Sequence, residues 1–174
     1  FANSGMVVNI EEKDYRTKAG PLAAMQFQQA VEQKAFQLGG GKFVAPALRM
    51  TDFVSGKISA TLPDCSYLPG IHAAALWDVL PGFVYNSLAE GFTAFGQKMR
   101  GYFSREAVVV ATESRTSSPV RIPRNSDNLQ HPQVKGLYPA GEGAGYAGGI
   151  VSAAMDGEKI SRIIIAELTG KIIT

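Results

Sequence analysis

The chain has 174 residues, of which 45% are hydrophobic and 18% charged, and this composition is enough for a packed core in one or two small domains. Its formal charge of +2 comes from Lys and Arg residues spread along the sequence, without the basic stripe that nucleic-acid binding requires. Charged residues also interrupt every apolar stretch before it reaches the about 18 residues of a bilayer span. We therefore expect no nucleic-acid partner and no membrane association.

Two features of the sequence bear on its context. The chain begins with Phe1 instead of methionine, and its opening FANSGMVVNI lacks the charged and apolar regions of a signal peptide, so we expect the interior of a longer protein. Its single cysteine, Cys65, excludes an internal disulfide, which agrees with a cytoplasmic location. A redox role for this lone thiol is not expected, because no base lies near it in the sequence.

Two long helices are predicted in the first hundred residues, after a strand at Met6–Ile10. The first begins at Pro21, which suits the first helical turn, continues to Phe36 with apolar residues at spacings of three and four, and ends at a glycine triplet at 39–41. The second covers Phe83–Arg100, where one stripe of the helix is apolar and largely aromatic. This stripe is interpreted as core instead of as a cofactor contact.

The region between these helices is less regular. Residues 58–69 are predicted to form a loop because they contain two prolines, and Ile71–Leu80 is predicted to be a short helix. This helix carries His72, and the second histidine, His131, lies in a polar excursion far along the chain. Neither histidine has a cysteine or carboxylate cluster beside it, so no metal site is expected.

A buried strand is predicted at Ala107–Thr112, because its almost continuous β-branched sequence suits a strand covered on both faces. The donor-rich sequence ESRTSS follows directly, at the end of the strand where α/β sheets bind their ligands. Arg115 in this sequence could bind an anionic group through two hydrogen bonds. The alternative is that Glu113 and Arg115 form an ion pair on a surface turn, and such a pair contributes little to the stability of the fold.

The stretch from Gly136 to Gly157, GLYPAGEGAGYAGGIVSAAMDG, predicts a strand, a glycine-dense turn and the start of a helix. The strand is expected at Leu137–Tyr138 and the helix at Ile150–Leu168. Glycines in the turn let a ligand approach the backbone, and the start of a helix presents free N–H groups and the positive end of the helix dipole. This arrangement favours a phosphate or another electron-rich group.

The sequence GAGYAG at residues 143–148 formally fits the dinucleotide-binding pattern G-x-G-x-x-G. That pattern needs a second strand after the helix, with an acidic residue at its end, and only Lys171–Thr174 follow the predicted helix here. We therefore expect that the turn contacts the far end of a cofactor whose phosphates are bound by residues outside this chain.

This stretch, together with ESRTSSPVRIPR at Glu113–Arg124, resembles the C-terminal part of bacterial FAD-dependent dehydrogenases of the glutathione-reductase-like flavoprotein superfamily. The similarity is close from Glu113 to about Arg162, and FANSG at residues 1–5 and SYLPG at residues 66–70 are similar with less specificity. The resemblance implies FAD as cofactor, a small-molecule substrate, and hydride or electron transfer by the full-length oxidoreductase.

The resemblance also implies a mixed α/β chain in two parts. Residues 1–105 would be part of an inserted substrate-side domain, and residues 106–174 would be the C-terminal segment of a Rossmann-like FAD-binding domain. The remainder of the same polypeptide would be the main partner. Because the segment that binds adenosine diphosphate is missing, we expect the isolated fragment to be inactive and to bind FAD weakly.

Several cofactor-binding residues follow from this resemblance. Glu142 is expected to accept hydrogen bonds from the ribityl chain, and the backbone of Gly148, Gly149 and Ile150 is expected to lie against the pyrimidine end of the isoalloxazine. The Ile150 side chain would point into the core. Gly141 and Arg115 complete the predicted set, and no residue is an obvious catalytic acid or base.

One alternative comes from a different class of function. The chain could be a non-catalytic interaction module in which the glycine turn is vestigial. The sequence supports both functions, and flavin binding by the full-length protein distinguishes them.

Overall fold

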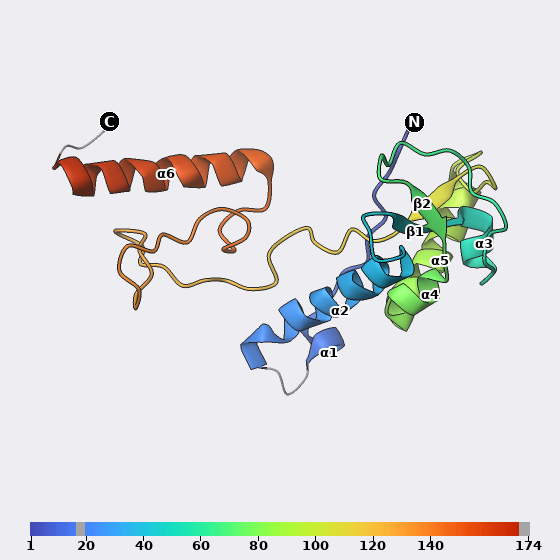
Figure 1. Ribbon diagram of the computed structural model, residues 1–174, viewed down its shortest axis with the longest axis horizontal. Coiled ribbons are helices and arrows are strands. Elements are labelled where there is room, and N and C mark those ends of the chain that lie inside the picture. The colour runs from blue at the N-terminus through green and yellow to red at the C-terminus, as the bar shows by residue number, and fades with distance from the viewer. Residues whose placement is uncertain (17–19, 171–174) are drawn as a thin grey trace. The chain divides into compact units, whose positions relative to one another are not determined.

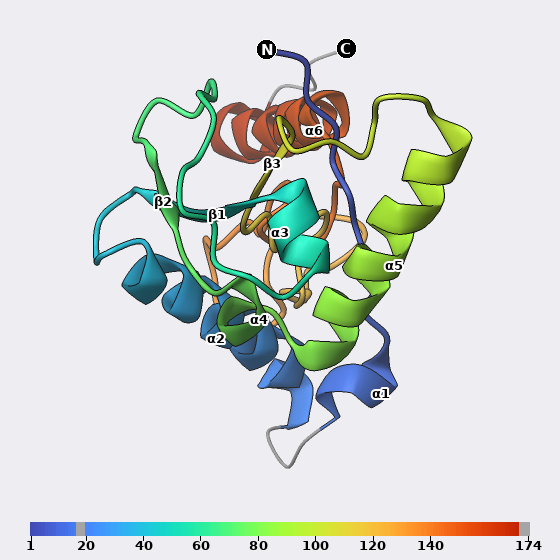
Figure 2. The same ribbon diagram turned by 90° about the vertical axis from the view of Figure 1, so that its right-hand side faces the viewer.

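The computed structural model describes residues 1–16 and 20–170 of the chain. The stretch Lys171–Thr174 lies outside the described residues. Contacts divide the chain into two compact units, here called the first unit (Phe1–Tyr15 and Gln26–Ser114) and the second unit (Arg16–Met25 and Arg115–Thr174). Figure 1 labels the helices and the strands β1 and β2, and Figure 2 also labels β3.

A small mixed sheet forms the centre of the first unit. Its strands are β1 (Ala45–Arg49), β2 (Ile71–Ala73) and β3 (Val108–Val110), in the order β2-β1-β3. Strand β1 runs parallel to β2, with Ala45 opposite Ile71, and antiparallel to β3, with Ala47 opposite Val110. Three strands and six α-helices in the described part of the chain confirm the predicted mixed α/β class.

Both long helices predicted before residue 105 are confirmed. The first is α2 (Ala23–Leu38), which follows a 3₁₀ turn at Gly20–Leu22. It ends at the glycine triplet, where Gly40 and Gly41 have φ angles of 86° and 72° that favour glycine. The second is α5 (Gly82–Lys98). The short helices of the first unit are α1 (Glu12–Tyr15), α3 (Met50–Val54) and α4 (Leu76–Val79).

The predicted helix at Ile71–Leu80 is wrong in its first half. Residues 71–73 form β2, and helix α4 begins only at Leu76. The Ala45 N–H donates to the Gly70 carbonyl at 3.0 Å, and the Ala74 N–H donates to the Ala47 carbonyl at 3.3 Å. Pairing with β1 therefore determines the conformation of this segment, because a non-local ladder outweighs a weak local helical preference.

The strand predicted at Ala107–Thr112 forms, but it is not buried on both faces. Strand β3 lies at one edge of the sheet, and Val110 is partly exposed. The central, buried strand is β1, in which Ala47 and Leu48 are fully covered. The β-branched sequence predicted a strand but did not indicate its position in the sheet. By its pairing with β1, β3 also contributes to the first unit.

The strands predicted at Met6–Ile10 and Leu137–Tyr138 do not form. A strand needs a hydrogen-bonded neighbour, and no described residue pairs with either segment in a ladder. The long helix of the second unit is α6 (Ile150–Thr169). Residues 115–149, which precede it, form loops and turns. One stripe of α6 is covered, and it includes Ala153, Asp156 and the buried Ile160.

The core of the first unit lies where α3, α4 and α5 meet β1. Phe53 in α3 is fully buried, its ring lies 4.7 Å from the Tyr85 ring and 5.5 Å from the Phe92 ring, and the last pair is edge-to-face. Figure 2 shows α3 between β1 and α5. Leu88 and Phe92 of α5 are buried as predicted, which confirms that part of the aromatic stripe as core.

The loop after α3 is held to the sheet by Arg49. Its Nε donates to the Thr61 carbonyl at 2.7 Å, and its Nη1 donates to the Arg105 carbonyl at 2.7 Å. The buried Ser59 hydroxyl accepts from the Arg49 N–H and donates to Asp52 at 2.6 Å. The predicted loop at 58–69 therefore begins as an ordered segment, although it contains neither helix nor strand.

Truncation of Phe53 tests this description of the core. Phe53→Ala should destabilise the first unit by about 3–5 kcal/mol, because it removes buried contacts and leaves a cavity. Denaturant unfolding measures the loss. Phe43→Ala is the matched control, since Phe43 is 81% exposed and its truncation should change the stability by less than about 0.5 kcal/mol. Equal losses in the two variants would contradict the assignment.

Candidate functional site

In the second unit, an ion pair between Arg124 and Asp156 connects the segment that precedes the glycine turn to helix α6. Arg124 Nη1 donates to Asp156 Oδ2 at 2.9 Å, and Nη2 donates to Oδ1 at 2.7 Å. The two side chains are only 9% and 10% exposed. Two parallel hydrogen bonds between a guanidinium and a carboxylate fix both distance and orientation.

Each partner of this ion pair also binds the backbone of the glycine turn. Arg124 Nη1 donates to the Pro139 carbonyl at 2.8 Å, and Asp156 Oδ2 accepts from the Gly141 N–H at 2.9 Å. The hydrogen bonds from Arg124 lower the pKa of Asp156 below its ordinary value of 3.8, and the Gly141 N–H adds to this effect, while burial opposes it. The same pairing raises the pKa of Arg124.

The ring of Tyr146 covers the Arg124 guanidinium. The centre of the ring lies 3.6 Å from Arg124 Cζ and 4.3 Å from Arg121 Cζ, so both cations interact with its π face. The Tyr146 hydroxyl donates to the Ile122 carbonyl at 3.0 Å, and the Ile122 N–H donates to the Ala144 carbonyl at 3.1 Å. Segment 120–124 therefore lies beside the glycine turn.

Two glycines of the turn are required by the backbone conformation of the chain, and one of them also by a close contact. Gly141 has a φ of 65°, and Gly145 has a φ of 83°. A Cβ on Gly145 would also lie 2.8 Å from the Val120 carbonyl oxygen, so a side chain there would collide with the backbone. The predicted cofactor role of Gly141 is limited by this geometry, because its N–H is already bonded to Asp156.

Three other glycines have no such explanation. A Cβ on Gly143 or Gly148 would meet nothing within 4 Å, and one on Gly149 would meet only the Ser152 hydroxyl at 3.8 Å. Gly149 has a φ of −166°, an extended conformation that any residue adopts. Within the described residues, neither packing nor backbone conformation requires glycine at 148 or 149, so the space above them is open to a group from outside this chain.

Helix α6 starts directly after these glycines. The Gly149 N–H donates to Ser152 Oγ at 3.1 Å, so it is not one of the free donors that were expected. The first bond within the helix runs from the Ala153 N–H to the Gly149 carbonyl at 2.9 Å. No described residue accepts from the N–H groups of Ile150, Val151 or Ser152, which makes them the free donors at the start of the helix.

Arg115 and Glu142 are brought together by the fold. Arg115 Nε lies 3.5 Å from Glu142 Oε1, and the side chains are 51% and 36% exposed. The ion pair of Arg115 is therefore with the glycine turn and not with Glu113, the alternative that the sequence left open. This contact places a cation beside the carboxylate of the turn.

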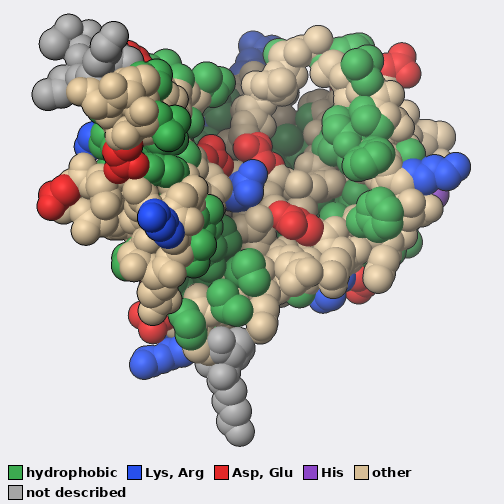
Figure 3. All heavy atoms as spheres, turned by 60° about the vertical axis from the view of Figure 1, so that its left-hand side comes forward, with side chains coloured by type: hydrophobic (Ala, Val, Ile, Leu, Met, Phe, Trp, Pro, Cys, Tyr) green, Lys and Arg blue, Asp and Glu red, His purple; other side chains and the backbone are tan. Residues whose placement is uncertain are grey.

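The side chain of Ile150 does not point into a core, as was expected. It is 92% exposed. By helical spacing Ile150 extends the covered stripe of α6, but the turn covers this stripe only from Ala153 onward. Other apolar side chains of α6 are also exposed, and Figure 3 shows hydrophobic side chains in green on the molecular surface. The exposed apolar side chains of α6 include Val151, Met155 and Leu168.

Sequence reasoning missed the residues that order the site, namely Arg124, Tyr146 and Asp156. A signal was available for Asp156, because it falls at the helical spacing of the covered positions Ala153 and Ile160. A carboxylate on the covered stripe of a helix needs a buried partner. No comparable local signal marks Arg124, whose partner is 32 residues away.

Two other kinds of site are absent from the described residues. Among residues 1–16 and 20–170, no three His, Cys, Asp or Glu side chains are grouped so that they could bind a metal ion. No described helix is long and apolar enough to span a membrane.

Comparisons with known proteins assign the chain to a family. A family model described as FAD-dependent protein, C-terminal domain-like, matches residues 1–116, and the chain belongs to this family. A protein of Clostridium beijerinckii, described as an uncharacterized protein, is 43% identical over 166 residues. The alignment covers 94% of this chain and 31% of that protein, so the chain spans about a third of the length of the relative it matches.

The family confirms FAD as the cofactor of the protein to which the chain contributes, and it confirms the resemblance to the C-terminal part of FAD-dependent proteins. The match covers residues 1–116, which include the less specific similarities at residues 1–5 and 66–70, whereas the close resemblance in sequence covers Glu113 to about Arg162. Of the predicted cofactor-binding residues, only Arg115 lies within the matched range. The roles of Gly141, Glu142, Gly148, Gly149 and Ile150 therefore stay predictions.

Removal of the Asp156 charge tests the central ion pair. Asp156→Asn should lower the free energy of opening of the glycine turn by roughly 3 kcal/mol, because Arg124 loses its charged partner in a largely buried position. Hydrogen exchange of residues 136–150 in the full-length protein measures this free energy. Glu158→Gln is the control, since Glu158 forms an exposed pair with Arg162 whose loss should cost at most about 0.5 kcal/mol.

The pH dependence of the same comparison has a defined sign. Because the folded pKa of Asp156 lies below its ordinary value, its stabilising effect is complete above that value and is lost as the pH falls through the folded pKa. The difference in the free energy of opening between wild type and Asp156→Asn should therefore become smaller at acid pH, after correction for intrinsic exchange rates. A difference that stays constant into acid would contradict this role.

Proposed function

We propose that the chain is the C-terminal segment of an FAD-dependent oxidoreductase of the glutathione-reductase-like superfamily. In this proposal, residues 106–174 complete a Rossmann-like FAD-binding domain, and residues 1–105 belong to an inserted substrate-side domain. Bound FAD would supply hydride or electron transfer to or from a small-molecule substrate. The family assignment supports the flavoprotein part of this proposal.

The observation that carries the proposal is the open backbone at Gly148 and Gly149. A side chain there would meet no obstacle within the chain, so the backbone at these two glycines is accessible to a group that approaches from outside. The free N–H groups of Ile150, Val151 and Ser152 and the positive end of the α6 dipole would stabilise electron-rich atoms at this place. The residues present therefore fit the pyrimidine end of a flavin.

Glu142 would accept hydrogen bonds from ribityl hydroxyl groups on the same side of the turn. Its neighbour Arg115, 3.5 Å away, would orient this carboxylate or contact an anionic group directly. Gly141 would contribute indirectly, because its N–H holds the turn against Asp156. The arrangement contains no residue that we propose as a catalytic acid or base.

The exposed apolar side chains of α6 support a further part of the proposal. Ile150, Val151 and Met155 leave a large apolar area in contact with water, which is unfavourable unless another surface covers it. The chain spans 31% of the relative, and we infer that the remainder of the same polypeptide covers this helix.

Retention of FAD tests the proposed function. The full-length protein should purify with a flavin spectrum, and Glu142→Ala should raise the Kd for FAD about 10- to 150-fold, the loss of one hydrogen bond to a charged group. Equilibrium dialysis measures this change, with Glu158→Ala as the control on α6. A colourless protein that FAD does not reconstitute would instead support the interaction module with a vestigial glycine turn.

Gly149→Val tests whether the start of α6 lies against the flavin. The extended backbone of Gly149 accepts valine, so the fold should be retained within about 1 kcal/mol, the range of N-cap substitutions. The side chain should nevertheless expel the cofactor or lower its reduction potential, measured by redox titration. Gly157→Val is the control on the same helix, where a Cβ also meets nothing within 4 Å. Unchanged flavin content and potential in Gly149→Val would refute this placement.

A further inference from the structure

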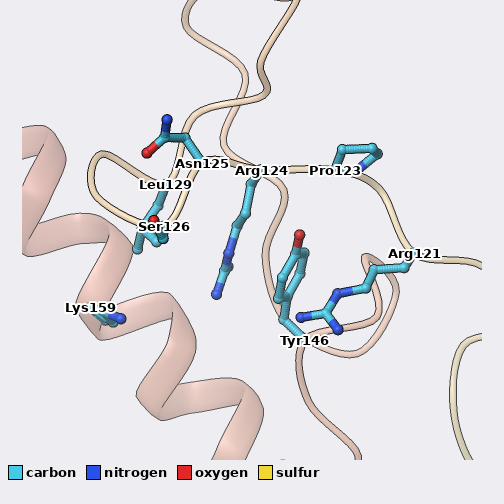
Figure 4. A pocket seen from close by; sticks show the side chains of 8 residues that line it. All are labelled: Arg121, Pro123, Arg124, Asn125, Ser126, Leu129, Tyr146 and Lys159. Carbon is cyan, nitrogen blue, oxygen red and sulfur yellow. The ribbon is translucent and has the colours of Figure 1, made fainter.

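A pocket of about 550 Å³ lies on the second unit. Its wall includes Arg121, Arg124 and Tyr146, the loop residues Asn125 and Leu129, and Lys159 from α6. Figure 4 shows the Tyr146 ring between the two guanidinium groups, with Lys159 on the helix nearby. Lys159 is nine residues beyond Ile150, which is about 14 Å along a helix axis.

The three cationic side chains of this wall differ in their pairing. Arg124 is neutralised by Asp156 through two hydrogen bonds. Arg121 and Lys159 form no ion pair with a carboxylate among the described residues of the chain. Three cations and one paired carboxylate leave two positive charges at the pocket, although Asp127 lies next to its rim at Ser126. An excess of positive charge in a concave surface attracts anions.

The polar groups of the pocket offer donors and few acceptors. The Asn125 Oδ1 atom accepts from the Asp127 N–H at 2.8 Å, which leaves its amide Nδ2 without a partner in the described structure. A guanidinium and an ammonium have no acceptor atoms. The ligand that this set of donors complements therefore has acceptor atoms and negative charge.

The pocket is also ordered before any ligand binds. Arg121 lies against Tyr146, and the Tyr146 hydroxyl is bonded to the Ile122 carbonyl, so the guanidinium has a fixed support. Leu129 is 2% exposed and has a φ of 57°, an unusual conformation for a leucine, so the loop is bent in a way that buries this side chain beside the pocket. A preformed site loses less entropy on binding.

We propose that this pocket binds a small molecule that carries a phosphate group, through Arg121, Lys159 and the Asn125 amide. Arginine and lysine are the common phosphate-binding side chains, and here they come from two different parts of the pocket wall, a loop and helix α6. The volume exceeds that of a phosphate and leaves room for an organic part, such as a nucleoside. This site is separate from the proposed flavin contact and does not depend on it.

The test uses the full-length protein saturated with FAD, so that positions for the phosphates of the flavin are filled. AMP is titrated by calorimetry, with adenosine as the probe that lacks the phosphate and inorganic phosphate as a competitor. We expect saturable binding of AMP with a Kd below about 1 mM, no binding of adenosine, and competition by phosphate. Absence of saturable binding by both AMP and phosphate, or equal binding of adenosine, would overturn the proposal.

Two variants locate the site. Lys159→Gln, on an exposed face of α6, and Arg121→Gln should each weaken AMP binding about tenfold, the loss of one charge-assisted hydrogen bond. Lys135→Gln is the control, because it makes the same change of charge at an exposed position of the same unit outside the pocket. Wild-type affinity in Lys159→Gln, or an equal loss in Lys135→Gln, would overturn the proposal. Flavin absorbance is recorded separately and reports on the proposed function alone.

Discussion

The bidentate ion pair between Arg124 and Asp156 is the interaction on which the second unit depends. This unit has one long helix and no sheet in its described residues, so an apolar core alone supplies little order. Arg124 and Asp156 also bind the carbonyl of Pro139 and the N–H of Gly141, and they thereby fix the path of the glycine turn over α6. Because both charges are largely covered, the geometry must be maintained closely, since an unpaired buried charge is strongly unfavourable.

The glycines of the turn serve two distinct purposes. Gly141 and Gly145 adopt backbone angles that favour glycine, and Gly145 also allows the turn to lie against segment 120–121. Gly148 and Gly149 have ordinary or extended backbone and open space around them. Position in a glycine-rich sequence therefore does not identify a ligand contact. Only glycines without an internal explanation support a role in binding, and in the turn these are Gly143, Gly148 and Gly149.

The second unit contains two groups of charged side chains apart from the Arg124–Asp156 pair. Arg115 forms a partly exposed ion pair with Glu142 of the glycine turn. At the pocket, Arg121 and Lys159 form no direct ion pair in the described part of the chain, although the charge of Lys159 acts on Asp156. Tyr146 contacts both arginines of the pocket wall and also supports the turn through segment 120–124. Occupation of the pocket by an anion would therefore act on the same residues that order the turn.

The sequence by itself determined the long helices and the glycine turn, because apolar spacing, Pro21 and the glycine triplet at 39–41 are local signals. It also indicated FAD as the cofactor, through a resemblance that the family match supports. The tertiary structure alone decided that residues 71–73 pair with β1, that β3 lies at an edge, and that Ile150 is exposed. It alone joined Arg124 to Asp156 and Arg115 to Glu142. These features depend on partners distant in sequence, and local periodicity contains no information about which distant residue will supply a hydrogen bond or a covering surface.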